Sequence, residues 1–189
     1  PFLGEAACKR TMRIRASEFS IEEENDAYRM EIVYSTVSHA SFPALLRQVK
    51  LTNKTKEKAR VEILDGLPVF FPHGLSNVVY KEMVFLMAAY CVVRGNENNQ
   101  PFVKFKTSTG DNPIVTESKD GHGFAAVDQN GSFLKTIVDP SCVFGSDPSL
   151  MTAHPFMDQD SSQFERQTQQ TENKLPCAFV HKEVEIEGE

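Results

Sequence analysis

The chain has 189 residues, of which 40% are hydrophobic and 24% are charged, a composition typical of a globular domain rather than of a disordered segment. Its formal net charge of -6, with no dense cluster of Lys and Arg, argues against nucleic acid and against an anionic membrane surface as partners. The longest apolar run, Met83 to Val93, is well short of the roughly 20 residues that a spanning helix needs, so no membrane span is predicted.

The cysteines and the start of the chain bear on its cellular setting. Cys8, Cys91, Cys142 and Cys177 are far apart and form no CxxC pair, which predicts reduced thiols rather than a disulfide framework. The chain begins at Pro1 without the basic, apolar and small-residue order of a signal peptide, so its start is predicted to be a processing boundary. Together these features predict a cytoplasmic protein.

The first two-thirds of the chain alternates between apolar and polar residues with a period of two, which is typical of half-buried strands, and the alternation returns at residues 177–187. Met12 and Ile14 alternate with Thr11 and Arg13 in the first such stretch. The predicted strands cover residues 11–16, 19–23, 28–35, 44–52, 58–67, 102–107, 114–116, 124–128, 133–138 and 177–187. Their spacing predicts one mainly β domain over residues 1–189, an antiparallel β-sandwich with one or two short helices.

Two hairpins are predicted in detail. Asn130-Gly131, flanked by Val127 and Phe133, is the dipeptide that best tolerates a tight hairpin turn. A second turn at residues 54–57 is predicted to pair the strand 44–52 with the strand 58–67. Its register sets these residues opposite each other: Leu51 and Val61, Val49 and Ile63, Lys50 and Glu62.

The second hairpin carries one structural prediction about charge. The same register sets Arg47 opposite Asp65, and both have the parity of the apolar face. We therefore predict a structural ion pair between them, because each charge would otherwise be buried without a partner.

A helix and a long connection complete the predicted elements. Ser76 can cap a helix whose apolar residues recur at helical spacing from Val79 to Leu86, and this helix is predicted to end near Met87, before a buried strand at 88–93. Periodicity disappears over residues 139–176, which are predicted to form a long irregular loop within the domain.

The sequence contains no motif for catalysis, for a metal or for a cofactor. No Gly-x-Ser-x-Gly turn and no glycine-rich phosphate loop occurs, and the histidines are isolated in the sequence. We therefore predict no catalytic residue, no metal site and no cofactor. The histidines are His39, His73, His122, His154 and His181.

Two polar loops, 96–100 and 107–112, supply the candidates for contact with a substrate. Amide and hydroxyl groups can bond sugar hydroxyls, although the same residues are common in ordinary turns. The candidate residues are Asn96, Asn98, Asn99, Thr109, Asp111 and Asn112.

Several segments of the sequence resemble a known protein family. Leu64-Asp65-Gly66-Leu67-Pro68, continuing to Phe71-Pro72-His73-Gly74-Leu75, resembles the N-terminal sandwich domain of the cellobiose phosphorylase-like proteins of glycoside hydrolase family 94. Residues 44–53, 107–111 and 138–145 look like the same lineage. The resemblance implies a galactose mutarotase-like supersandwich that precedes an (α/α)6 barrel in a longer polypeptide.

In that family, inverting phosphorolysis of β-glucosides takes place in the barrel, where an aspartic acid protonates the leaving oxygen. Nothing in these residues corresponds to the barrel, so the resemblance implies a non-catalytic fragment of a larger multidomain enzyme, inactive alone. The barrel of the same polypeptide is the implied partner, and an oligosaccharide and a second copy of the chain are further candidates.

Two other readings stay open at this stage. An autonomous carbohydrate-binding module is compatible with a sandwich that carries amide-rich loops. A complete aldose mutarotase-like enzyme would need a His and a Glu within hydrogen-bonding reach of each other.

Overall fold

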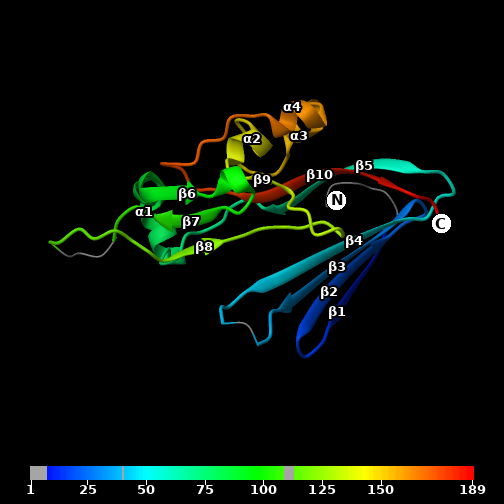
Figure 1. Ribbon diagram of the computed structural model, residues 1–189, viewed down its shortest axis with the longest axis horizontal. Coiled ribbons are helices and arrows are strands. Elements are labelled where there is room, and N and C mark those ends of the chain that lie inside the picture. Colours follow the sequence, from blue (N-terminus) through cyan, green and yellow to red (C-terminus); the bar gives the residue numbers. More distant parts are fainter. Residues whose placement is uncertain (1–7, 40, 109–112) are drawn as a thin grey trace. The chain divides into compact units, whose positions relative to one another are not determined.

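The computed structural model describes residues 8–39, 41–108 and 113–189 of the chain (Figure 1). The protein is mainly β, with 39% of its residues in strands and 18% in helices, and its sheets are antiparallel. The predicted fold class is therefore confirmed, although four helices occur in the described part of the chain instead of one or two. No helix within these ranges is both long enough and apolar enough to cross a bilayer.

The chain divides into two compact units by its internal contacts. The single domain predicted over residues 1–189 stays a prediction. The first unit contains the described residues up to Val61 together with Val184–Glu189. The second is Glu62–Glu183.

The first unit contains a four-stranded antiparallel meander. Its strands are β1 (Lys9–Ile14), β2 (Glu18–Glu24), β3 (Tyr28–Thr36) and β4 (Leu45–Asn53), hydrogen-bonded in that order. One row across the sheet is apolar, and it consists of Met12, Ile21, Ile32 and Val49. The adjacent row, on the opposite face, consists of Thr11, Glu22, Glu31 and Lys50. The period-two alternation thus sorts the two faces as predicted.

The predicted hairpin between residues 44–52 and 58–67 is wrong. β4 pairs with β3, while β5 (Ala59–Leu67) is hydrogen-bonded to β10 (Ala178–Ile186). The buried Asn53 shapes the connection: its side-chain oxygen accepts from the backbone N–H of Thr55 (3.0 Å), and its amide donates to the carbonyls of Glu57 (2.7 Å) and Ile186 (3.3 Å). The connection is thereby tied to the C-terminal strand.

The second unit begins with a helix and a three-stranded sheet. α1 (Asn77–Tyr90) starts as predicted, because Ser76 Oγ accepts from the backbone N–H of Val79 at 3.2 Å. The helix continues past its expected end near Met87, with non-helical angles at Met83. The sheet has the order β6-β7-β8, from β6 (Cys91–Arg94), β7 (Phe102–Phe105) and β8 (Gly121–Gly123), and a short 3-10 helix, η1 (Asn96–Asn98), lies between β6 and β7.

The outcomes for the remaining predicted strands differ. Residues 114–116 form no strand, and residues 124–128 contribute a single bridge from Val127 to Phe133. That bridge flanks the predicted Asn130-Gly131 turn, in which Gly131 has a φ of +80°. β9 (Lys135–Ile137) and β10 confirm the strands expected near the end of the chain, and together with β5 they form the sheet β5-β10-β9.

The segment 139–176 contains three short helices. They are α2 (Pro140–Phe144), α3 (His154–Asp158) and α4 (Ser161–Glu165), and α3 contacts both of the others (Figure 1). Phe144 and Phe164 from these helices are buried in one cluster with Ile137 and Phe179 of the sheet. The segment therefore supplies part of the core of the second unit.

Candidate functional site

A hollow of about 290 Å³ lies in the second unit, beside α1 and α2. Its walls are mainly apolar and include Val69, Tyr80, Phe144 and Leu175. Ser141 and Lys174 contribute polar groups to the same hollow. A concave apolar surface with a few polar groups is the common form of a small-molecule site.

An ion pair lies at the polar edge of this hollow. Lys174 Nζ donates to Asp139 Oδ1 at 2.6 Å and also to Ser141 Oγ. The Asp139 side chain is only 8% exposed, whereas that of Lys174 is 30% exposed. The Asp139 side chain is therefore buried, and the Lys174 side chain is partly exposed.

Asp139 holds two parts of the chain together. Oδ1 accepts from the backbone N–H of Ser141 at 2.9 Å, which caps α2, and Oδ2 accepts from the backbone N–H of Gln170 at 2.9 Å. Burial on its own raises the pKa of this carboxyl group, but the bonds from Lys174, Gln170 and Ser141 outweigh burial, so the net pKa is lowered. The carboxylate form is thus the one that the surroundings favour.

The cluster is suited to binding rather than to nucleophilic catalysis. A serine nucleophile needs a neighbouring base that takes its proton, and an ammonium in an ion pair has no lone pair to accept one. Ser141 Oγ accepts a hydrogen bond from Lys174 in this arrangement. What the cluster offers a ligand is a hydroxyl group and one end of a charged pair.

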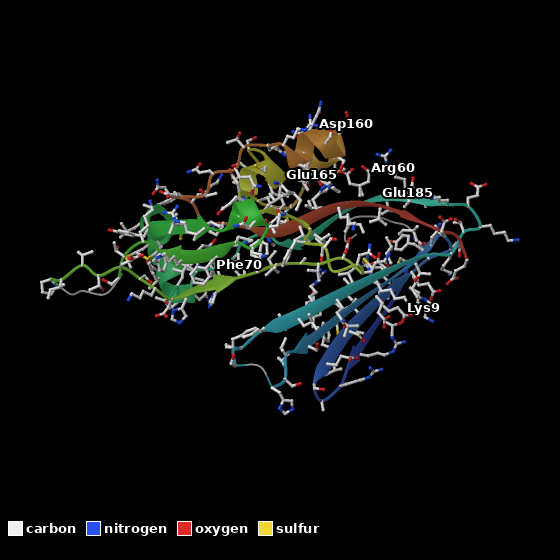
Figure 2. All side chains as sticks on the ribbon, in the orientation of Figure 1. Lys9, Arg60, Phe70, Asp160, Glu165 and Glu185 are labelled. Carbon is white, nitrogen blue, oxygen red and sulfur yellow. The ribbon has the colours of Figure 1, made fainter. Side chains whose placement is uncertain are left out.

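A second polar cluster surrounds His181 on β10. Nδ1 lies 2.8 Å from Glu165 Oε1, and Nε2 lies 2.7 Å from Glu62 Oε1. Ionised carboxylates only accept hydrogen bonds, so both bonds form together when the imidazole ring carries both protons. Glu165 lies at the C-terminal end of α4, where Figure 2 labels it, so the cluster connects α4 to β5 and β10.

This cluster does not have the access that sugar chemistry needs. The His181 side chain is 0% exposed, and its ring packs against Phe164 and Phe156 at centroid distances of 5.1 and 6.0 Å. A His and a Glu are within hydrogen-bonding reach, as a mutarotase-like enzyme requires, but both ring nitrogens already bond carboxylates. Glu165 and Glu62 bond different nitrogens of the ring. Within the described ranges, no group of three or more His, Cys, Asp or Glu side chains is arranged to hold a metal ion.

The structure uses two of the predicted sugar contacts internally. Asn96 Oδ1 accepts from the Thr136 hydroxyl at 2.9 Å, and Asn99 Oδ1 accepts from the Thr136 backbone N–H at 3.3 Å. Asn98 lies in η1. The other three candidates, Thr109, Asp111 and Asn112, lie outside the described residues. Their contact with a substrate stays a prediction.

Arg47 and Asp65 lie on different strands that do not form the predicted hairpin. On β4, Arg47 Nε donates to the Tyr34 hydroxyl at 3.0 Å, and the guanidinium lies 5.5 Å from the centroid of that ring. Asp65 lies on β5. The ion pair between the two residues stays a prediction.

Sequence reasoning missed the residues of both clusters. Asp139-Pro140 is a recognisable helix start, with an acidic cap followed by Pro in the first turn, and this signal could have found α2. Nothing local connects Asp139 to Lys174, or His181 to Glu62. No family model matches the chain, and no curated protein matches it.

Proposed function

We propose that the chain is a non-catalytic β-rich domain of a cytoplasmic, carbohydrate-active enzyme of the glycoside phosphorylase kind, whose catalytic barrel belongs to the same polypeptide. The observation that carries the proposal is the apolar outer surface of α1. The resemblance of residues 64–75 to the family 94 sandwich domain supplies the class of enzyme.

α1 has large apolar side chains that face solvent as well as ones that face the core, although Lys81 and Glu82 are also exposed on it. Met87 is buried, with Val79 packed nearby, whereas Phe85 is 90% exposed, Val78 71% and Leu86 50%. A group of large apolar side chains exposed on one helix is the kind of surface that another protein or domain covers.

The polar clusters support a role without catalysis. In the described part of the chain, the Asp139 carboxylate is committed to Lys174 and the His181 imidazole to two glutamates. Neither cluster presents an acid and a base to an open cleft. The chain therefore supplies a packing surface, and the reacting groups belong to the partner domain.

The catalytic part of the proposal is tested by incubating the purified chain with cellobiose and inorganic phosphate. We expect no sugar phosphate, and sustained turnover that follows the chain through purification would overturn the proposal. Calorimetry with β-glucan oligosaccharides tests the alternative of an autonomous module, which requires heat of binding to an extended chain of sugars.

The packing part is tested with Phe85→Ser on α1. Because the exposed ring contributes nothing to the core, we expect an unchanged free energy of unfolding, together with reduced binding of an apolar dye. Phe42→Ser is the matched control, since Phe42 is 62% exposed but lies outside α1. Equal effects of the two variants on dye binding would show that the surface of α1 does not differ from other exposed apolar residues. If the parent chain is a homodimer in sedimentation without dye, and Phe85→Ser dissociates it, the surface binds a second copy of the chain instead of the barrel.

A further inference from the structure

We propose that His181, Glu62 and Glu165 form a pH-sensitive latch, which holds the C-terminal end of α4 on the sheet while the imidazole ring carries both protons and loosens it when the pH rises and the ring loses one. The latch does not depend on the proposed function, because it rests on the bonds, the burial and the packing of these three residues. Histidine suits such a role, since it is the side chain whose charge changes closest to neutral pH.

The closed state of the latch needs two protons on the ring. Nδ1 lies 2.8 Å from Glu165 Oε1 and Nε2 lies 2.7 Å from Glu62 Oε1, so each nitrogen faces a carboxylate oxygen. An ionised carboxylate has no proton to donate, and a neutral imidazole has a single N–H. Loss of one ring proton therefore leaves one carboxylate against a bare nitrogen, and both of these groups can only accept.

Water cannot replace the lost bond at the ring. The His181 side chain is 0% exposed, and its ring packs against Phe164 and Phe156. A polar group without a partner costs free energy in such surroundings, and a charged one costs more. The cost is relieved when one glutamate turns its carboxylate away from the ring and into solvent.

Glu165 is the glutamate that is free to turn. Its side chain is 41% exposed, compared with 31% for that of Glu62. Glu62 lies on β5, which is hydrogen-bonded to β10, the strand that carries His181. Glu165 is instead the last residue of α4, a helix of only five residues, where Figure 2 labels it. The remaining ring proton then stays on Nε2 with Glu62, and the bond to Glu165 is the one that breaks.

Charged or titratable side chains lie on every element around the ring. Within the described ranges, the side chains that bond the ring are those of Glu62 and Glu165. The two protonation states of the ring therefore differ first in these two bonds. Alternation and register place the full set as follows: Arg60 and Glu62 on one face of β5, Glu183 on the same face of β10 as His181, Lys135 opposite His181 on β9, His154 and Asp158 on α3, and Glu165 and Arg166 at the end of α4.

The change is confined to the end of α4, because other contacts hold this segment in both states. Phe164 is 1% exposed and is buried in one cluster with Ile137 and Phe179. Gln167 Nε2 donates to the backbone carbonyls of Cys142 and Phe164, at 3.2 Å each. None of these contacts involves a group that gains or loses a proton near neutral pH. A rise in pH therefore loosens the last turn of α4 and leaves the second unit folded.

The test measures hydrogen exchange of the Phe164 and Arg166 amides between about pH 5.5 and about pH 8.5, with each rate divided by that of an unstructured peptide at the same pH. Both amides donate within α4, to the carbonyls of Asp160 and Gln163. We expect their protection to fall about tenfold as the His181 ring, followed by its own NMR signals, loses a proton, because a hydrogen bond to a charged group is lost.

The amide of Cys177, which donates to the Val138 carbonyl at 2.9 Å, reports on the core of the same unit and should keep its protection. Three results would overturn the latch: unchanged protection of α4 while the ring titrates, a ring that keeps both protons over the whole range, and an equal loss of protection at Cys177.

Glu165→Gln tests the mechanism, because its amide bonds the ring in both states. The Gln oxygen can accept from Nδ1–H when the ring carries both protons, and the Gln NH₂ can donate to Nδ1 when the ring carries one. We expect the exchange of α4 to lose its pH dependence in this variant. Asp158→Asn is the matched control, an exposed carboxylate at the end of α3, and should behave like the parent chain. A pH dependence that persists in Glu165→Gln, or that disappears in Asp158→Asn, would contradict the latch.

Discussion

Replacing Lys174 with Met tests the ion pair that borders the hollow. Met keeps most of the length of the side chain but leaves the Asp139 carboxylate, 8% exposed, with only two backbone donors. Removing one partner of a fully buried pair costs about 3–5 kcal/mol. The open, 30% exposed end at Lys174 lets water reach the site, so we expect the free energy of unfolding to fall by about 2–3 kcal/mol.

A double variant separates the stability that comes from the ion pair of Asp139 and Lys174 from the contribution of each side chain alone. Asp139→Asn should also destabilise the chain, because the amide loses the charge and one acceptor oxygen. In Asp139→Asn/Lys174→Met both charges leave together, so no unpaired charge remains. We expect the double variant to lose less stability than the sum of the single losses.

The pH dependence has a definite sign. The pKa of Asp139 is lowered in the folded chain from its ordinary value of 3.8, so its contribution to stability is present above that pH and is lost as the pH falls through the folded pKa. Without Lys174, the carboxyl group loses one of the interactions that lower its pKa, so its pKa lies higher in the variant than in the parent chain, and protonation relieves the variant at a higher pH. The stability gap between the parent chain and Lys174→Met should therefore narrow as the pH falls from about 7 to about 3.

The measurement is urea unfolding followed by circular dichroism, combined with hydrogen exchange of the Gln170 amide, which donates to Asp139. Arg15→Met is the control, because the pair of Arg15 with Glu18 is exposed at both ends and should contribute little. If Lys174→Met and Arg15→Met lower the free energy of unfolding by the same small amount, and the Gln170 amide keeps its protection, the ion pair of Lys174 with Asp139 is hydrated. The expected loss of about 2–3 kcal/mol is then wrong.

Three further predictions concern packing and the second cluster. A Cβ at Gly66 would lie 1.9 Å from the Ala178 carbonyl oxygen, so Gly66→Ala should cost about 3 kcal/mol in urea unfolding, whereas Gly74→Ala, at a φ of +86° in open space, should cost about 1. His181→Leu should speed hydrogen exchange of the α4 amides, and unchanged exchange would show that its bond to Glu165 does not hold α4. The pKa of all four thiols is raised, with burial as the main cause, but only Cys8 is partly exposed, so a thiol reagent should modify only Cys8 in the native chain; rapid reaction of all four would contradict the burial of the other three. The pKa is about 12 for Cys91 and about 11 for Cys142, and it is also raised for Cys177.

Local patterning accounts for the strands but not for their partners. The rows of β1 to β4 follow from alternation, because each row places like residues opposite each other along short connections. Alternation alone made β5 look like a suitable partner for β4, because Val61 and Ile63 could lie opposite Leu51 and Val49. In the structure Met30 and Ile32 of β3, which alternate in the same way, lie opposite these two residues. Alternation specifies which face a residue takes, and it leaves the choice between two suitable partners to the rest of the chain.

The helices at residues 139–176 were missed for a different reason. Asp139-Pro140 and His154-Pro155 read as breaks in periodicity, since Pro interrupts a helix interior. In the structure each Pro lies in the first turn of a helix, where its missing N–H needs no partner. Helices of five residues are too short to show a helical period, so a break and a start look alike in the sequence.

The two polar clusters depend on contacts between residues that are far apart in the sequence, so the candidate site could not be predicted from the sequence. Glu62 and His181 are 119 residues apart, and Asp139 and Lys174 are 35 apart. A charged residue in a polar stretch carries no sign of the partner that it meets after folding. Because β5 pairs with β10 rather than with β4, Glu62 lies beside His181 instead of opposite Lys50. The same pairing that overturned the predicted hairpin thus created the cluster.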